Sequence, residues 1–262
     1  MKLIISILLL AVTFKASADP QFTNISESDF ENITKEMSAN FTHSSLLGAS
    51  KMGTIFGFQV GLTAAQTSTP NTNEIVKRNA GSELPSLYNV GLMGAVGIPF
   101  GIAFEAVIIP KLTTSGASLS ATSMALKYNI NEVIPVLPLN LALRGFYSDA
   151  SFAFSQTVST VNVDVTNKTK VTGVQLLLSP MIPLVEPYVG IGLLSGSNEL
   201  GVTGSNPIFA PGYSTSQTET KTVSGTQLLA GVDVNLLLIK IGAEYSQAFG
   251  ASRVGFKLGI GF

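Results

Sequence analysis

The fold is decided by the last stretch of the sequence, Val254-Gly255-Phe256-Lys257-Leu258-Gly259-Ile260-Gly261-Phe262. Its apolar residues alternate strictly with three glycines and one lysine, which is the period of a β-strand with two unlike faces. A soluble sheet would carry polar side chains on its solvated face, whereas this strand leaves that face almost bare. The pattern is typical of a strand that turns an apolar side to lipid and a small or charged side to an enclosed lumen.

The composition supports a membrane location without a membrane-spanning helix. Hydrophobic residues make up 45% of the chain and charged residues only 12%, with 25 glycines and a mean hydropathy of +0.40. A soluble domain carries about 25% charged residues. The mature sequence contains no run of the roughly 18 apolar residues that a transmembrane helix needs. A closed β-barrel is the other structure that satisfies its backbone within lipid.

The first 18 residues predict a secretory signal peptide. Lys2 precedes an apolar run from Leu3 to Val12, and Ala16-Ser17-Ala18 offers small residues for cleavage near Ala18. The mature chain then carries a net charge of about −3, which does not indicate a nucleic-acid partner. Cysteine is absent, so disulfides and thiolate metal sites are excluded.

Residues 19 to 52 predict a periplasmic or plug segment with one short helix from about residue 28 to 41. Ser28 and Glu31 have the spacing of a capping box, and apolar residues follow at helical spacing: Phe30, Ile33, Met37 and Phe41. We expect this helix to pack on the periplasmic rim or mouth of the barrel in preference to plugging the lumen. His43, the single histidine, is expected to be a solvated residue between the helix and the first strand.

Residues 53 to 262 predict a closed antiparallel transmembrane β-barrel of about ten strands, within a range of eight to twelve. Each alternating segment has about the length of a tilted transmembrane strand, and an even number is the rule for such barrels. The predicted strands are Thr54 to Ala64, Tyr88 to Ile98, Gly101 to Pro110, Leu119 to Ile130, Leu139 to Phe154, Val165 to Leu178, Tyr188 to Leu200, Thr222 to Val234, Leu237 to Ser246 and the closing strand.

The links between strands alternate in length. Those at 65 to 87, 147 to 166 and 198 to 221 are long and polar, which indicates extracellular loops, whereas the others are short and indicate periplasmic turns. This assignment places both termini on the periplasmic side and makes residues 70 to 85 an exposed flexible loop. Two short links, 133 to 138 and 180 to 185, are apolar. Because exposed apolar turns are costly in water, we expect the N-terminal helix to cover them.

The inward positions of the strands carry both signs of charge. The predicted lumen-lining residues are Glu105, Lys127, Arg144, Asp233, Lys240, Glu244 and Lys257. Ionisable residues at membrane depth are tolerated where they face a lumen and pair with one another. Two interpretations follow: a salt-bridge network that fills a narrow barrel, or a polar path whose charges select small solutes. The many inward glycines favour some free space in the lumen.

The sequence does not indicate an enzyme. A serine or water nucleophile usually needs an imidazole base, and His43 lies far from the outer strand ends in the predicted topology. The acidic residues are too scattered to predict a catalytic, cofactor or metal site. We therefore expect no enzymatic activity and no cofactor.

The closing Phe262 and the predicted architecture resemble bacterial outer-membrane β-barrel proteins, including small barrels of families of unknown function with an N-terminal helix. The resemblance implies that Phe256, Leu258, Ile260 and Phe262 form a signal read by the barrel-insertion machinery, and that outer-membrane lipid surrounds the chain. It carries no catalytic motif. The expected function is that of an integral outer-membrane protein, a narrow channel for small solutes or a structural envelope component. The alternative is a surface-binding or adhesion protein that acts through its extracellular loops.

Overall fold

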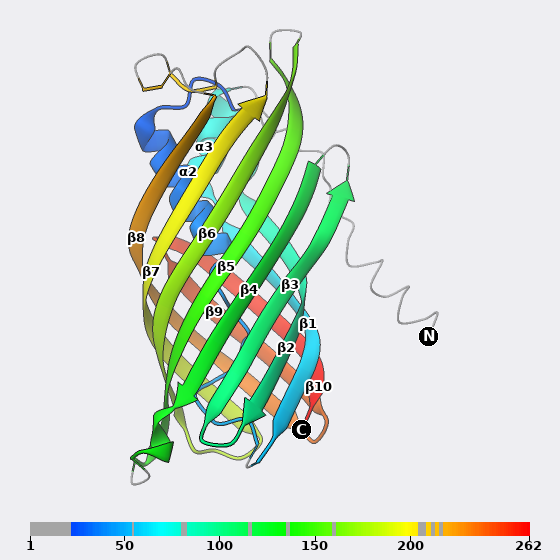
Figure 1. Cartoon of the computed structure of the whole chain (residues 1–262), viewed down its shortest axis with the longest axis vertical. Helices are drawn as coiled ribbons and strands as arrows, with labels where there is room; N and C mark the ends of the chain where they lie inside the picture. Colours follow the sequence, from blue (N-terminus) through cyan, green and yellow to red (C-terminus); the bar gives the residue numbers. More distant parts are fainter. Residues whose placement is uncertain are drawn as a thin grey trace, which may run out of the picture.

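The computed structural model shows a closed antiparallel barrel of ten strands with a helix inside it (Figure 1). It describes residues 22 to 262 apart from 54, 80–82, 115–116, 135–136, 159–160, 204–207, 211–212 and 215–216. The predicted strand number and fold class are confirmed. The predicted signal peptide and its cleavage site lie outside the described residues.

Each strand pairs with its sequence neighbours, and β1 closes the barrel on β10, with Val60 opposite Ile260. The strands are β1 (Gly57–Ser68), β2 (Ser86–Ile98), β3 (Ile102–Thr114), β4 (Ala117–Asn129), β5 (Leu139–Val158), β6 (Val161–Pro180), β7 (Val185–Thr203), β8 (Thr218–Leu236), β9 (Ile239–Ala248) and β10 (Ala251–Gly261). A 3-10 turn, η1 (Ile130–Glu132), follows β4. The alternation of the sequence therefore located every strand, although several extend further than predicted.

The two ends of the barrel differ. At one, here called the turn end, short links join β2 to β3, β4 to β5, β6 to β7 and β8 to β9. The opposite end, here called the loop end, carries the links 69–85 and 204–217. Strands β5 to β8 have 19 or 20 residues, whereas β1, β9 and β10 have 10 to 12, so one side of the wall projects at the loop end (Figure 1).

The outer face carries a continuous apolar belt next to the turn end. Large apolar side chains on every strand are exposed there, among them Val60, Leu92, Phe104, Leu126, Leu143, Leu176, Ile191, Leu228, Ile241 and Phe256. Tyr88, Tyr147 and Tyr245 are exposed at the border of the belt, and the residue two positions nearer the loop end is polar in each case: Ser86, Asp149 and Gln247. An apolar band bordered by aromatic residues is the surface expected of a barrel in lipid.

The helix α2 (Glu27–Asn40) lies inside the barrel at the loop end, and the preference for the periplasmic rim was wrong (Figure 1). It contacts β1 and β6 to β10, and Phe30, Ile33 and Met37 are buried. The helix bounds lie within one residue of those predicted, but the capping box is formed by Ser26 and Asp29, two residues earlier than predicted. The physical reason for the internal position is that the wall at this end is apolar on its inner face.

Further expectations about the links and the chain ends were wrong. The link 69–85 contains a helix, α3 (Pro70–Arg78), and most of 147 to 166 is strand. The link predicted at 198 to 221 is shorter, because β7 continues to Thr203 and β8 begins at Thr218. The described chain begins at the loop end, where Ile25 bridges to Phe209, and so at the end of the barrel opposite to Phe262. The apolar turns at 133 to 138 and 180 to 185 are not covered by the helix, and Val133 and Leu184 are exposed beside the apolar belt.

Candidate functional site: the lumen and the segment threaded through it

The loop-end half of the lumen is an apolar core. Phe30 and Ile33 of α2 pack there against inward side chains of the projecting strands, which include Phe146, Phe154, Val165, Val171, Leu194, Leu200, Val202 and Val223. The link between β7 and β8 adds Phe209, whose ring lies 5.8 Å from that of Phe30. Burial of this apolar surface fixes the helix, because each fully buried large side chain contributes about 1.5 to 3 kcal/mol.

Helix α3 is fastened to α2 by two charged contacts. The buried carboxylate of Glu36 accepts hydrogen bonds from the backbone N–H groups of Asn71 and Thr72, at 2.9 and 2.8 Å. These are unpaired donors of the first turn of α3, where a negative charge is favourable. At the other end, Arg78 pairs with Asp29 at 2.6 Å. The two helices together close the lumen at the loop end.

Hydrogen bonds also set the charge of Asp29. Burial acts to raise the pKa of its carboxyl, but hydrogen bonds with Ser26 and the Arg78 guanidinium outweigh burial and lower the pKa. The carboxylate is therefore the form that stabilises the junction between α2 and α3.

Below α2, residues 41 to 53 run through the lumen to the turn end as an extended segment, here called the threaded segment. Side chains of the barrel wall donate hydrogen bonds to the backbone of this segment. The wall donors, with the carbonyl oxygen each one reaches, are Arg253 to Thr42 at 2.9 Å, Lys257 to Leu46 at 2.7 Å, Arg144 to Leu47 at 2.7 Å, Lys127 to Gly48 at 2.8 Å, and Asn129 to Ala49 at 2.8 Å. Five side chains from three strands, β4, β5 and β10, thus satisfy carbonyls that no regular secondary structure pairs.

The serines of the threaded segment complete the pairing in the other direction. Their hydroxyls donate to wall carboxylates: Ser44 to Glu244 at 2.8 Å, Ser45 to Glu105 at 2.6 Å, and Ser50 to Glu186 at 2.5 Å. Wall cations therefore bind the backbone of the segment, and wall carboxylates bind its side chains. The two sets together hold the segment along its length.

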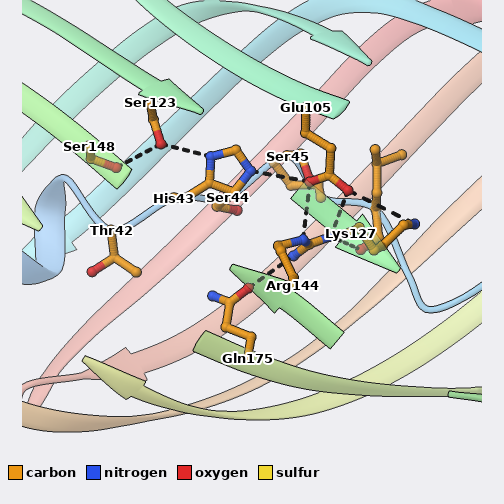
Figure 2. A network of polar contacts seen from close by, with 12 residues as sticks. Thr42, His43, Ser44, Ser45, Glu105, Ser123, Lys127, Arg144, Ser148 and Gln175 are labelled. Atoms are coloured by element: carbon orange, nitrogen blue, oxygen red, sulfur yellow. Dashed lines mark hydrogen bonds and ion pairs between the residues drawn. The ribbon is translucent and has the colours of Figure 1, made fainter. Parts of the chain in front are cut away.

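Glu105 is the centre of the polar network (Figure 2). Its buried carboxylate lies 3.0 Å from Nε of Arg144, 3.2 Å from Nε2 of His43 and 3.9 Å from Nζ of Lys127. Arg144 also donates to Gln175, which donates in turn to Gln227. A buried carboxylate is tolerated only when paired and hydrogen-bonded, and here β3, β4 and β5 each supply a member of the cluster.

His43 is buried, so the expectation of a solvated loop residue was wrong. Its Nδ1 lies 2.7 Å from the hydroxyl of Ser123, which lies 2.6 Å from that of Ser148, and its Nε2 faces Glu105 (Figure 2). A serine, an imidazole and a carboxylate are the groups of a hydrolase triad. Here, however, the side chains of His43 and Glu105 are fully excluded from solvent. The arrangement is that of a buried hydrogen-bonded chain between plug and wall.

The structure brings six of the seven predicted lumen residues into this network. Glu105, Lys127, Arg144, Asp233, Glu244 and Lys257 are buried, and Lys257 pairs with Asp233 at 3.0 Å. Lys240 is half-buried near the turn end. The predicted insertion-signal residues lie on the outer face, where the ring of Phe262 contacts that of Phe58.

The sequence analysis predicted the charged lumen residues but missed the uncharged residues that bind to them. Tyr188 and Gln175 occupy inward positions and could have been found by the same alternation. The threaded segment gave no signal, because the main-chain carbonyls that it offers to wall donors leave no pattern of residue types. Free space beside the inward glycines is also filled: the Tyr188 ring lies against Gly231, and Leu46 lies against Gly242.

The described residues offer neither a metal site nor a membrane-spanning helix. Within the described ranges, no group of three or more His, Cys, Asp or Glu side chains could hold a metal ion. Of the helices that the structure describes, none has the length and apolar character needed to cross a bilayer.

Comparison with known proteins gives one family and several similar folds. A family profile described as "Family of unknown function (DUF6588)" matches residues 1–262, and no curated protein sequence matches. The structure is similar to the attachment invasion locus protein Ail of Yersinia pestis, with 12% identity, a TM-score of 0.38, and coverage of 79% of this chain and 97% of that chain.

Two other solved structures are similar. For the outer membrane protease OmpT from Escherichia coli the identity is 9% and the TM-score 0.41, with 83% of this chain and 99% of that chain covered. For the translocator domain of autotransporter NalP from Neisseria meningitidis the identity is 11% and the TM-score 0.45, with 90% of this chain and 95% of that chain covered. The likeness is one of fold.

Proposed function

This chain belongs to DUF6588, a family of unknown function, and we propose that it is an integral outer-membrane protein whose barrel is sealed by its own N-terminal segment. Its function is that of a closed structural component of the envelope. The observation that carries this proposal is the occupied lumen: residues 22 to 53 fill it from the loop end to the turn end, with contacts to the wall along the way.

Three observations support the membrane location. The apolar belt surrounds the barrel, tyrosines border it, and the charged side chains at the depth of the belt point inward. Closure of the barrel also leaves no unpaired strand edge in the belt, which lipid would not tolerate. We place the loop end outside and the turn end in the periplasm, because outer-membrane barrels have short periplasmic turns. A signal peptide cleaved near Ala18 would deliver the chain to the periplasm, where Phe262 and its neighbours are available to the insertion machinery.

The geometry favours the structural function over the channel. A solute path would need a continuous hydrated gap, but Glu105, Arg144 and Lys127 are directed to one another and to the threaded segment. Ion selectivity cannot be set by charges that no passing ion reaches. The side chains that the sequence offered as channel lining are therefore proposed to hold a plug.

Conductance in planar bilayers tests this proposal. The protein refolded in detergent is expected to insert and pass no steady current. A variant that lacks residues 27 to 52 is expected to conduct, provided that it retains the heat-modifiable gel mobility of a folded barrel. Steady ion-selective current through the unaltered protein, at the level of the deletion variant, would contradict the closed barrel and restore the channel interpretation.

The alternative is surface binding through the loop end. The projecting parts of β5 to β8 supply a platform, but their outward charges are mixed, and Lys168 pairs with Glu199 at 2.9 Å. Such a surface favours neither an acidic nor a basic partner, so the closed structural barrel is the better-supported function.

A further inference from the structure

A polar cavity of about 170 Å³ lies at the turn end, where the threaded segment leaves the lumen. It is lined by backbone and side chains of that segment and by inward residues of the wall, among them Gln59, Lys127, Glu186, Asp233, Asn235 and Lys240. Lys127 belongs both to this lining and to the network around Glu105, whereas Gln59 and Lys240 take no part in that network. The cavity is therefore the space that the contacts around Glu105 leave unfilled at the turn end.

Two donors of this cavity lack acceptors. The side chain of Gln59 is 3% exposed, and its Nε2 has no hydrogen-bond partner among the described residues. The side-chain ammonium of Lys240, which also lines the cavity, makes neither an ion pair nor a hydrogen bond with the part of the chain that the structure describes. A buried N–H group without an acceptor is destabilising, so an acceptor bound here would be favoured.

The carboxylates of the cavity are already satisfied. Glu186 accepts hydrogen bonds from the backbone N–H and hydroxyl of Ser50 and from the hydroxyl of Ser179. Oδ1 of Asp233 makes no regular hydrogen bond, but it lies 3.0 Å from Nζ of Lys257 in an ion pair. What remains to be filled is therefore a site for negative charge, because the free groups are an ammonium and an amide N–H.

We propose that this cavity binds a small oxyanion of the phosphate class. A phosphate oxygen accepts several hydrogen bonds at once, and a charge-assisted bond from Lys240 is stronger than a neutral one. The volume is several times the roughly 30 Å³ that one water molecule occupies in the liquid, so a tetrahedral anion fits together with some water. The phosphate group comes from one of two sources: free phosphate compounds of the periplasm, or the headgroup of a phospholipid at the rim.

The binding is tested on the full-length mature protein in maltoside micelles without phosphate. Titration with inorganic phosphate, followed by ³¹P NMR line broadening and by the shift in unfolding temperature, is expected to show saturable binding. Lys240→Met is expected to weaken that binding about tenfold, since it removes the charged donor. Gln59→Leu is expected to weaken it less. Each variant has a matched control outside the cavity: Lys111→Met, which changes the net charge equally, and Gln247→Leu on the outer face.

A second arm separates the two sources. In nanodiscs of phosphatidylethanolamine, a site filled by a lipid headgroup no longer responds to inorganic phosphate, whereas a site for free phosphate still does; both outcomes support the proposal. Absence of saturable broadening with the unaltered protein in micelles would overturn it, without reference to any variant. Equal binding by Lys240→Met and Lys111→Met would overturn it as well, because the anion would then be bound elsewhere. Neither result bears on whether the barrel is closed.

Discussion

The two halves of the lumen hold the same N-terminal segment by different physical means. At the loop end, a helix buries apolar side chains such as Phe30 and Ile33 against an apolar wall. At the turn end, an extended segment offers main-chain carbonyls to wall cations and hydroxyls to wall carboxylates. The first half depends on which side chains the segment carries, whereas the second depends mainly on the residues of the wall.

The difference reflects where the barrel meets lipid. In the belt the outer face must be apolar, so the strands keep their polar residues for the lumen, and these require a partner that offers both donors and acceptors. An extended backbone is such a partner, because its carbonyls are unpaired. Beyond the belt the outer face meets water, and the inner face becomes the apolar one. A helix, whose backbone groups are paired internally, is the matching partner there.

Removal of the Glu105 charge is expected to cause the largest loss in the free energy of unfolding. Glu105→Gln leaves Arg144 and Lys127 buried without their carboxylate, and loss of one partner from a buried ion pair costs about 3 to 5 kcal/mol. The free energy of unfolding of the refolded protein, measured by urea titration in lipid vesicles, checks this. The matched control is Glu83→Gln, because that exposed carboxylate pairs with Lys77 at the surface and should cost less than about 1 kcal/mol.

A double variant sharpens the first result. Adding Arg144→Met to Glu105→Gln removes one of the two buried cations that have lost their carboxylate. The double variant should therefore lose less stability than the sum of the losses in the two single variants. Simple additivity would mean that the turn-end network is not electrostatically coupled, and the contrast between the two halves would fail.

Ser45→Ala is expected to cause the next largest loss in the free energy of unfolding. The hydroxyl donates to the Glu105 carboxylate at 2.6 Å, and hydrogen bonds to charged groups contribute about 1.5 to 3 kcal/mol. The same urea titration measures the loss. Ser28→Ala, at an exposed position of α2, is the control and should change the free energy of unfolding little. A loss no greater than that of the control would show that the threaded segment is held by its backbone contacts alone.

The sequence predicted the strands, their faces and the inward charges, because two-residue alternation is a local property that lipid enforces. The sequence analysis did not predict that the helix lies inside the barrel, although the order of residues in the strands indicates it. In β5 the outward residues Leu141 and Leu143 are apolar near the turn end, but further on the apolar residues are the inward Phe152 and Phe154. This change of phase indicates an apolar interior at the loop end. The threaded segment could not be found this way, since its main-chain contacts leave no pattern of residue types.

A smaller effect is expected from Ile33→Val in the apolar half. Loss of one buried methylene costs about 0.5 to 1.5 kcal/mol, and the free energy of unfolding should fall by that amount. Ile191→Val is the matched control, because the same group is removed from a side chain on the outer face of the belt, where lipid can fill the space. Equal losses in the two variants would mean that α2 is not tightly packed in the loop-end half.

The smallest expected effect concerns Asp29, and it depends on pH. The pKa of this carboxyl is lowered in the folded protein, so its contribution to stability is present above its unfolded value of about 3.9 and is lost as the pH falls through the folded value. At pH 7, Asp29→Asn should therefore reduce the free energy of unfolding by up to about 1 kcal/mol, the range of exposed ion pairs. At pH values below the folded pKa, the difference between variant and parent should vanish, because both side chains are then neutral.

Ile33→Val supplies the contrast, since its loss involves no charge and should be the same at both pH values. A pH-independent difference for Asp29→Asn would show that the junction of α2 and α3 is held by shape, as the rest of the loop-end half is, and not by the charge that Arg78 faces.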